Sequence, residues 1–496
     1  RRRGADAQRP PQDLRRADVL LCTWRRFIAS GQADDWLACQ ADPAWAAGGV
    51  PLGGIGTGKV ELCRDGRFRN FSGNNNQDMP FEPPDGLEGA YLAVECGGQR
   101  RLLATRPAVG IDPCGRLEAD VAFPQVRLTA PGVFDGIDVE VLASAPLVPH
   151  DLETSCLPGF LLRWTVRNRR DVPADVTCRL AWPNLVGTGG GVGVPERAVG
   201  YADGSYRCWD APGAHAARRI EGEGFLALRY DNDPSPICPA ADGHHYVAVR
   251  HGAGRTEIAD DPRFGSAACT LTVPAGGEAA ADMAVVWEMP HWIDLTGVDR
   301  GAYWQNRFPD GRAILAHLFE RFDDVLAAAA ALRGLLDRTD LPEWMRRRLL
   351  NCCYPLVTNS VLYRDGRFSI NEGPTEMAGC YGTLDQRLAA HPATLLLMPE
   401  LNARELAQFA AVQAPGGGMN HDFGHGQLES GPQDRSWPDL TCSYILQAAR
   451  HAWLTGDEAF AEASWPKSRK AMLRHKAWAD QGGGVAQVGR TGLGTS

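Results

Sequence analysis

The sequence has no run of eighteen or more apolar residues, so it lacks a segment of the length that crosses a bilayer as a helix. It also lacks an excess of basic residues. Lys and Arg together number 51 against 60 Asp and Glu, which gives a net charge of −9, and no basic stripe is interleaved with aromatic residues. Nucleic acid is therefore not an expected partner.

No C-x-x-C spacing occurs among the 14 cysteines, which are scattered singly except for Cys352–Cys353. A chain of 496 residues can bury a sufficient core without disulfides. We therefore interpret the cysteines as mostly reduced, and we expect a cytosolic, cytoplasmic protein. The basic N-terminus contains only a short apolar run, Val19–Cys22, which is too short for a signal-peptide core. Because the chain does not begin with Met, a removed leader and a fragment both stay open.

Residues 45–290 are typical of an all-β segment. Turn clusters such as CGGQ and RNRRD separate short runs of β-branched and aromatic residues at the spacing expected of a sandwich. In LLRWTVRN, Leu162, Trp164 and Val166 share one face of the predicted strand. The predicted strands are Tyr91–Cys96, Val126–Thr129, Ile137–Val141, Phe160–Val166, Val176–Trp182, Phe225–Tyr230, Tyr246–Val249 and Met283–Glu288.

After Pro290 the apolar residues recur with the helical period. Asp340 is a plausible N-cap for the second of the predicted helices, with Pro342 in its first turn. The predicted helices are Arg312–Arg333, Leu341–Leu362, Asp385–Glu400, Asn402–Val412, Trp437–Leu454 and Glu458–Ala479, with a turn at Gly456-Asp457. Strands followed by helices indicate an α+β multidomain chain. We expect an N-terminal extension (1–44), a β-sandwich domain (45–290), a linker (291–310) and a helical domain (311–496).

Three carboxylates lie in and beside one loop between residues 372 and 385. Glu372 and Glu376 lie on the Gly/Pro-broken part, and Asp385 begins an amphipathic helix. Paired carboxylates that flank the scissile acetal are the catalytic groups of most glycosidases. Cys380 beside this loop is a possible nucleophile, although no neighbour in the sequence is an obvious activating group.

Two other glycine-rich stretches suggest chemistry at first sight. GVPLGGIGTGKV at 49–60 has the interval of a phosphate loop, but Val60 replaces the required Ser or Thr and a strand-like VELC follows. We interpret its glycines as permitting close backbone approach. His421-Asp422 and His425 lie in a glycine-flanked loop, where a His-x-x-x-His metal pair would need a helix. We expect no metal there, and hydrogen bonds from the His-Asp pair to a polyhydroxylated ligand instead.

The order of these motifs resembles glycoside hydrolase family 116, the β-glucosidases related to non-lysosomal glucosylceramidase, including bacterial ones. The resemblance covers residues 45–496. It is carried by GVPLGGIGTG, the β-segment, LPEWMRRRLLN, RFSINEGP, YGTLDQRL, LLLMPEL, the MNHDFG loop and LTGDEAFAEASWP.

The resemblance implies a β-sandwich packed on an (α/α)6 toroid, and a retaining, exo-acting β-glucosidase. About six helices suffice for only the first half of a toroid, so we expect a chain truncated at its C-terminus. The implied partner is a small-molecule or oligosaccharide β-glycoside, with no cofactor. The oligomeric state stays open.

The resemblance also assigns roles to single residues. Glu372, in Asn-Glu-Gly, matches the nucleophile, and Thr383-Leu384-Asp385 matches the downstream Thr-x-Asp. Thr383, Asp385, His421 and Asp422 then bind substrate. The acid/base is expected to be an Asp beyond Ser496.

The loop departs from the family in its length. The family's interval from the nucleophile to the Asp is shorter than the thirteen residues from Glu372 to Asp385 and longer than the nine from Glu376. Glu376 is therefore the second choice for the nucleophile. An altered loop also leaves β-N-acetylglucosaminidase and β-xylosidase as alternatives to β-glucosidase. An inverting phosphorylase or a non-catalytic sugar-binding relative on the same architecture stays open too.

Overall fold

The computed structural model describes residues 49–73, 86–187, 189–191, 207–208, 214–232, 242–292, 294, 298–372, 380–390, 392–424, 427–433 and 437–481. The predicted N-terminal extension, 1–44, lies outside these residues. Within them, no helix combines the length and the apolar character needed to cross a membrane.

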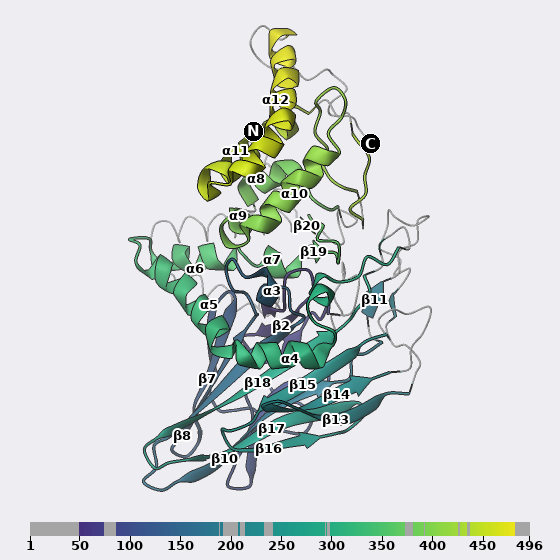
Figure 1. Cartoon of the computed structure of the whole chain (residues 1–496). Coiled ribbons are helices and arrows are strands. Elements are labelled where there is room, and N and C mark those ends of the chain that lie inside the picture. The colour runs from purple at the N-terminus through teal and green to yellow at the C-terminus, as the bar shows by residue number, and fades with distance from the viewer. Residues whose placement is uncertain are drawn as a thin grey trace, which may run out of the picture.

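Most of the described chain up to Glu288 folds into two antiparallel sheets (Figure 1). The strands are β4 (Tyr91–Cys96), β5 (Gln99–Leu102), β6 (Glu118–Ala122), β7 (Gln125–Phe134), β8 (Ile137–Ser144), β9 (Gly159–Asn168), β10 (Ala174–Pro183), β13 (Ala216–Gly222), β14 (Phe225–Asp231), β15 (His244–Arg250), β16 (Arg255–Ala259), β17 (Phe264–Val273) and β18 (Glu278–Glu288). One sheet has the order β13-β14-β15-β18-β9-β8-β7-β6, and the other has the order β16-β17-β10-β4-β5. All eight predicted strands lie inside observed strands, which confirms that this part of the chain is built from strands. The short strands β11 (Gly189–Gly191) and β12 (Arg207–Cys208) pair separately.

Large aromatic side chains fill the space between the two sheets. Phe160 on β9 and Trp287 on β18 come from the larger sheet, Trp182 on β10 comes from the smaller one, and all three are fully buried. The ring of Phe160 lies 5.7 Å from that of Trp182 and 6.4 Å from that of Trp287, measured between centroids. Burial of such rings supplies much of the stability of a sandwich core. The two sheets therefore form the predicted β-sandwich.

The glycine-rich stretch at 49–60 forms a hairpin, with its turn between residues 52 and 60. It joins β1 (Gly49–Leu52) to β2 (Val60–Cys63), which pairs onward with β3 (Phe68–Arg69), and Lys59 forms an ion pair with Glu61. Gly56 has a φ of +71°, its N–H donates to Ser360 Oγ at 2.8 Å, and a Cβ at this position would meet Leu362. Close backbone approach therefore explains this glycine, as predicted, and the turn packs on the segment that leads to the acidic loop.

Three of the predicted helices are interrupted. Arg312–Arg333 is in fact α4 (Gly311–Glu320) and α5 (Phe322–Asp337), broken at Arg321, whose ψ of 9° departs from helical geometry. The predicted helix Leu341–Leu362 is wrong in its second half. There α6 (Glu343–Asn351) and the single turn α7 (Pro355–Thr358) are followed by a strand. Asp385–Glu400 is divided into α8 (Leu384–Ala390) and α9 (Pro392–Leu397).

Proline accounts for two of these interruptions, because it has no N–H for a helical hydrogen bond and is favoured at a helix start. Pro355 begins α7 and Pro392 begins α9. The N-cap of α6 is Pro342, so the predicted cap at Asp340 is wrong. The last three helices agree closely with prediction: α10 (Pro399–Ala411), α11 (Pro438–Thr455) and α12 (Glu458–Gln481).

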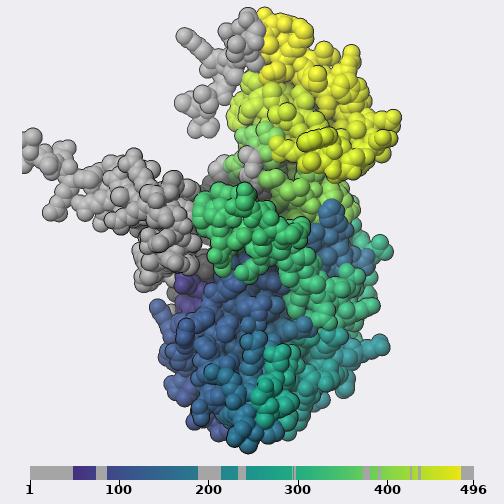
Figure 2. Space-filling view, turned by 90° about the vertical axis from the view of Figure 1, so that its left-hand side faces the viewer, coloured from purple at the N-terminus to yellow at the C-terminus, as the bar shows by residue number. Residues whose placement is uncertain are grey.

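Helices α4, α5 and α6 pack on the sandwich, and helices α8 to α12 form a separate group (Figure 1). Glu288, at the end of β18, accepts hydrogen bonds from Tyr246 Oη at 2.7 Å and from the N–H of Gly311 at 2.8 Å, which fixes the start of α4. Asp120 on β6 pairs with Arg333 and Arg347, which holds α5 and α6. The group α8–α12 is a narrower lobe above the sandwich (Figure 2). Its closure into a toroid stays a prediction.

His291 ties the segment after β18 to the turn before β15. Its Nδ1 lies 2.6 Å from Asp299 Oδ2, and its Nε2 lies 2.6 Å from Asp242 Oδ2. The hydrogen bond with Asp299 raises the pKa of His291 to about 9; burial opposes this, and Asp242 adds to it.

We expect this ion pair to contribute stability only while His291 is charged. Since its folded-state pKa lies above the ordinary value of about 6.5, the contribution is complete below that value and is lost as the pH rises through about 9. The free energy of unfolding of His291→Asn should fall below that of the wild type by up to about 1 kcal/mol near neutral pH, with no difference at pH values well above the raised pKa. Urea unfolding across this range measures the difference. A deficit that persists unchanged at high pH would contradict the assignment.

Candidate active site

The acidic loop begins at the end of a short hairpin. Strands β19 (Ser360–Leu362) and β20 (Phe368–Ile370) pair antiparallel and lead directly into Asn371 and Glu372. The chain is described again from Cys380, whose carbonyl accepts a hydrogen bond from the Glu372 N–H at 2.8 Å. An isolated antiparallel bridge joins Asn371 to Tyr381. The two ends of the loop are therefore held side by side.

The loop around residues 419–424 is joined to the same segment by backbone hydrogen bonds. The N–H of Tyr381 donates to Gly424 O at 2.9 Å, the N–H of Phe423 donates to Tyr381 O at 2.8 Å, and the N–H of Leu384 donates to His421 O at 2.8 Å. The fully buried Asn420 fixes this second loop, since its amide oxygen accepts from the Gln433 N–H at 2.7 Å and its Nδ2 donates to Gly431 O at 2.9 Å. Residues far apart in sequence thereby share one site.

Both carboxylate oxygens of Glu372 are faced by neutral donors. Thr383 Oγ1 donates to Glu372 Oε2, and Gln386 Nε2 donates to Glu372 Oε1. An ionised carboxylate is an acceptor-only group, so this pair of donors matches it. The start of α8 therefore orients Glu372.

His421 lies between two carboxylates. Its Nδ1 is 2.8 Å from Asp422 Oδ2, and its Nε2 is 3.6 Å from Asp385 Oδ1. The ring also packs edge-on against Trp437, with centroids 5.2 Å apart. Burial disfavours the charge on His421, but hydrogen bonds with Asp422 and Cys380 and the charges of Asp422 and Asp385 outweigh it and raise the pKa to about 10. The neighbouring carboxylates therefore favour the charged form of His421.

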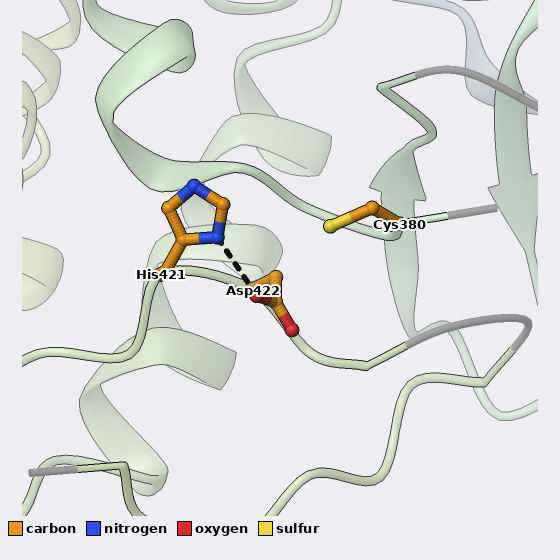
Figure 3. A group of neighbouring side chains, drawn as sticks. All are labelled: Cys380, His421 and Asp422. Carbon is orange, nitrogen blue, oxygen red and sulfur yellow. Dashed lines mark hydrogen bonds and ion pairs between the residues drawn. The ribbon is translucent and has the colours of Figure 1, made fainter. Parts of the chain in front are cut away.

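The Cys380 side chain lies against the same histidine. Its Sγ is 3.7 Å from Thr383 Oγ1, the same hydroxyl that donates to Glu372. Figure 3 shows Cys380 reaching toward His421 and Asp422 from the opposite segment. The donor atoms of these three side chains lie within 4.8 Å of one another, the only such group of metal-ligating type found in the described ranges. One continuous cluster thus runs from Glu372 through Thr383 and Cys380 to His421.

A buried ion pair lies next to this cluster and holds the strand that leads to Glu372. Arg387 on α8 lies 2.7 Å from Glu405 Oε1 on α10, and both side chains are about 5% exposed or less. Arg387 Nη2 also donates to Ile370 O at 2.7 Å, two residues before Glu372. Ser369 Oγ donates to Glu405 Oε1 at 3.0 Å. Helices α8 and α10 are thereby fastened to β20.

The structure brings together Glu372, Thr383, Asp385, His421 and Asp422, all predicted as site residues. Glu376 and His425 lie outside the described residues. Sequence analysis did not single out Gln386, Asn420 or the Arg387–Glu405 pair. Gln386 directly follows the predicted site residue Asp385, and this position is the only feature of the sequence that could have indicated its role. Asn420 and the ion pair act through contacts that no local pattern reveals.

Comparison with known proteins finds one family model that matches part of the sandwich. Residues 111–230 match a family model described as beta-glucosidase 2, glycosyl-hydrolase family 116 N-term. The matched stretch runs through the sandwich from just before β6 into β14. The match bears out the resemblance to glycoside hydrolase family 116 over this part of the sandwich.

Two solved structures share a distant overall likeness. One is described as "Putative kojibiose phosphorylase from human microbiome" (10% identity, TM-score 0.39), covering 84% of this chain and 55% of that one. Another is a family GH92 inverting mannosidase from Bacteroides thetaiotaomicron (13% identity, TM-score 0.32), covering 85% of this chain and 61% of that one. This chain therefore spans less than two thirds of either structure. TM-scores of this size carry no argument about activity.

Proposed function

We propose that this chain carries the nucleophile and part of the sugar-binding site of a retaining, exo-acting β-glycoside hydrolase that acts on β-glucosides. The observation that carries the proposal is the setting of Glu372. Its carboxylate is held by Thr383 and Gln386, next to the Asp385–His421–Asp422 group. A fixed carboxylate beside a set of charged hydrogen-bonding groups suits attack on a bound sugar.

In this mechanism Glu372 attacks the anomeric carbon and forms a covalent glycosyl-enzyme. A second carboxylic acid, about 5–5.5 Å away in retaining enzymes, protonates the leaving oxygen and then takes a proton from the incoming water. We assign this second role to none of the described residues.

Asp385, His421 and Asp422 would bind the ring hydroxyls. Charged donors and acceptors make stronger hydrogen bonds than neutral ones, and bonds that tighten as the ring flattens favour the transition state. Asp385 Oδ1 is buried and makes no hydrogen bond, so it can accept one from a hydroxyl. Thr383, expected as a substrate contact, already donates to Glu372, so we give it the role of positioning the nucleophile.

The test is covalent trapping with an activated dinitrophenyl β-glucoside in which fluorine replaces the hydroxyl next to the anomeric carbon. Fluorine slows hydrolysis of the intermediate, and the leaving group needs no acid catalyst. We expect a mass increase of one fluorosugar, located by peptide mapping on Glu372. Glu372→Gln should remain unlabelled. Glu400→Gln, which changes a carboxylate on α10 paired with Arg404, should be labelled like the wild type.

Other outcomes discriminate among the alternatives. An adduct on Glu376 would move the nucleophile within the loop. Labelling only by the corresponding xyloside or N-acetylglucosaminide would change the sugar. Turnover that requires phosphate and leaves no adduct would favour an inverting phosphorylase. Sugar binding without adduct or turnover in folded protein would favour a non-catalytic relative.

A further inference from the structure

We infer that Cys380, His421 and Asp422 form a binding site for a divalent transition-metal ion of the Zn²⁺ class. The three residues come from two segments that are paired by backbone hydrogen bonds, so their side chains are brought together by the fold. This inference stands on geometry and donor chemistry alone. It does not depend on the proposed hydrolysis.

Small shifts of the three side chains would give the donor spacing of a tetrahedral ion. Zinc binds thiolate sulfur at about 2.3 Å and imidazole nitrogen or carboxylate oxygen at about 2.0–2.2 Å, so neighbouring donors in a tetrahedral site lie roughly 3.3–3.7 Å apart. The three donors here lie within 4.8 Å of one another, and His421 Nδ1 is 2.8 Å from Asp422 Oδ2. An ion would replace the proton shared by those two atoms and draw the Cys380 sulfur inward. A fourth position would stay open.

The surroundings of His421 supply an independent indication. A metal-bound histidine usually directs its other ring nitrogen at a carboxylate, which fixes the ring and strengthens the ligand. Here His421 Nε2 faces Asp385 Oδ1 at 3.6 Å, and that oxygen is buried without a hydrogen bond. Asp422 is held in turn, because its Oδ1 accepts the Gly424 N–H at 2.8 Å while Oδ2 faces the histidine. Asp422 is thus already held by the backbone, and Asp385 lies where it would accept a hydrogen bond from a metal-bound His421.

The donor set also defines which ions fit. Thiolate and imidazole select zinc, cobalt and similar ions, whereas magnesium and calcium prefer oxygen ligands. His421, Asp422 and Asp385 are also the residues that we propose for sugar binding. A bound ion would occupy them, so Zn²⁺ should act as an inhibitor of the proposed enzyme and not as its cofactor.

The probe is Co²⁺, whose bond to a thiolate gives a charge-transfer absorption in the near ultraviolet. The titration uses protein with Cys352→Ser and Cys353→Ser, because Cys352 is exposed and adjacent to Cys353 and could bind metal by itself. We expect one equivalent of Co²⁺ to produce the band, Zn²⁺ to displace it, and a large excess of Mg²⁺ or Ca²⁺ to leave it unchanged.

Variants decide whether the site is the one inferred. Cys380→Ser should lose the charge-transfer band, and Asp385→Asn should keep it with an affinity about 10–100-fold lower. The matched control is Cys442→Ser. Cys442 Sγ lies 3.5 Å from His475 Nδ1, so it is another thiol beside an imidazole, but the described residues place no third ligand there. This variant should bind Co²⁺ as before.

The inference is overturned if folded protein, checked by circular dichroism, gives no band. It is overturned equally if Cys380→Ser keeps the band at full strength, or if Cys442→Ser removes it. The readout is optical, so it is separate from the fluorosugar experiment. Metal binding without a fluorosugar adduct would contradict only the proposed hydrolysis. A fluorosugar adduct without metal binding would contradict only the metal site.

Discussion

Replacing Glu372 with Gln should lower kcat/KM for an activated dinitrophenyl β-glucoside by about ten-thousand-fold or more, the scale of loss seen when a catalytic nucleophile is removed. Glutamine keeps the shape of the side chain but cannot form the glycosyl ester. Its amide oxygen can still accept a hydrogen bond from Thr383 or Gln386, so the fold of the site should persist. The measurement is the release of dinitrophenolate.

An activated leaving group isolates the role of Glu372. It needs no protonation, so the measured rate does not depend on where the acid/base residue lies. Glu400→Gln serves as the control, since it removes a carboxylate from an exposed pair with Arg404 at 3.4 Å and should leave the rate nearly unchanged. Turnover of Glu372→Gln within tenfold of the wild type would exclude this residue as the nucleophile.

The strands could be predicted from sequence wherever one face is apolar and the residues are β-branched or aromatic. On β9 the pattern of Leu162, Trp164 and Val166 identified the buried face correctly. The strand β17 has no such signal, because its sequence FGSAACTLTV is rich in small residues. It is nevertheless paired on both sides, with β10 and with β16. Its conformation is imposed by the neighbouring strands, which a local pattern does not report.

The helical part was harder to predict because apolar periodicity continues across real boundaries. Ser360–Leu362 reads as the end of a helix, but Gly56 packs against Leu362 and its N–H donates to Ser360, and the segment pairs with β20 instead. Long-range contacts of this kind decide the outcome for short apolar runs.

The candidate site residues could be named from the sequence, but their assembly could not be predicted from it. Glu372, Asp385 and the His421-Asp422 pair followed from motifs with a definite order. Their proximity depends on hydrogen bonds between segments about forty residues apart, such as Leu384 N–H to His421 O. Cys380 illustrates the limit of sequence reasoning. In the sequence it is an isolated cysteine beside the acidic loop, and only the paired segments place it beside His421 and Asp422.

The second large effect is expected at the ion pair of Arg387 and Glu405. Both side chains are buried, and Arg387 additionally binds Ile370 O, just before Glu372. Removal of one partner from a buried pair leaves an uncompensated charge and typically costs about 3–5 kcal/mol. We therefore expect Arg387→Met and Glu405→Gln each to lower the free energy of unfolding by about this amount. Urea unfolding measures the loss, and hydrogen exchange of α8 and α10 locates it.

A double variant separates the charge from the contact area. Arg387→Met combined with Glu405→Leu removes both charges and keeps apolar volume, so most of the lost stability should return. The control is the exposed pair of Arg404 and Glu400 on the same helix α10, whose removal should cost less than about 1 kcal/mol. Additive losses in the double variant would show that the two residues act separately.

The pH dependence of the single variants gives the sharper test. Burial already raises the pKa of Glu405, against the opposing effects of Arg387 and Ser369. Without Arg387 the buried carboxyl is harder still to ionise, so its folded-state pKa should rise further above the unfolded value. The stability deficit of Arg387→Met should therefore shrink as the pH falls and the carboxyl takes up a proton, whereas Glu405→Gln leaves a buried guanidinium that cannot lose its charge. Equal deficits at every pH in the two variants would argue that lost packing, and not an unpaired charge, is what destabilises them.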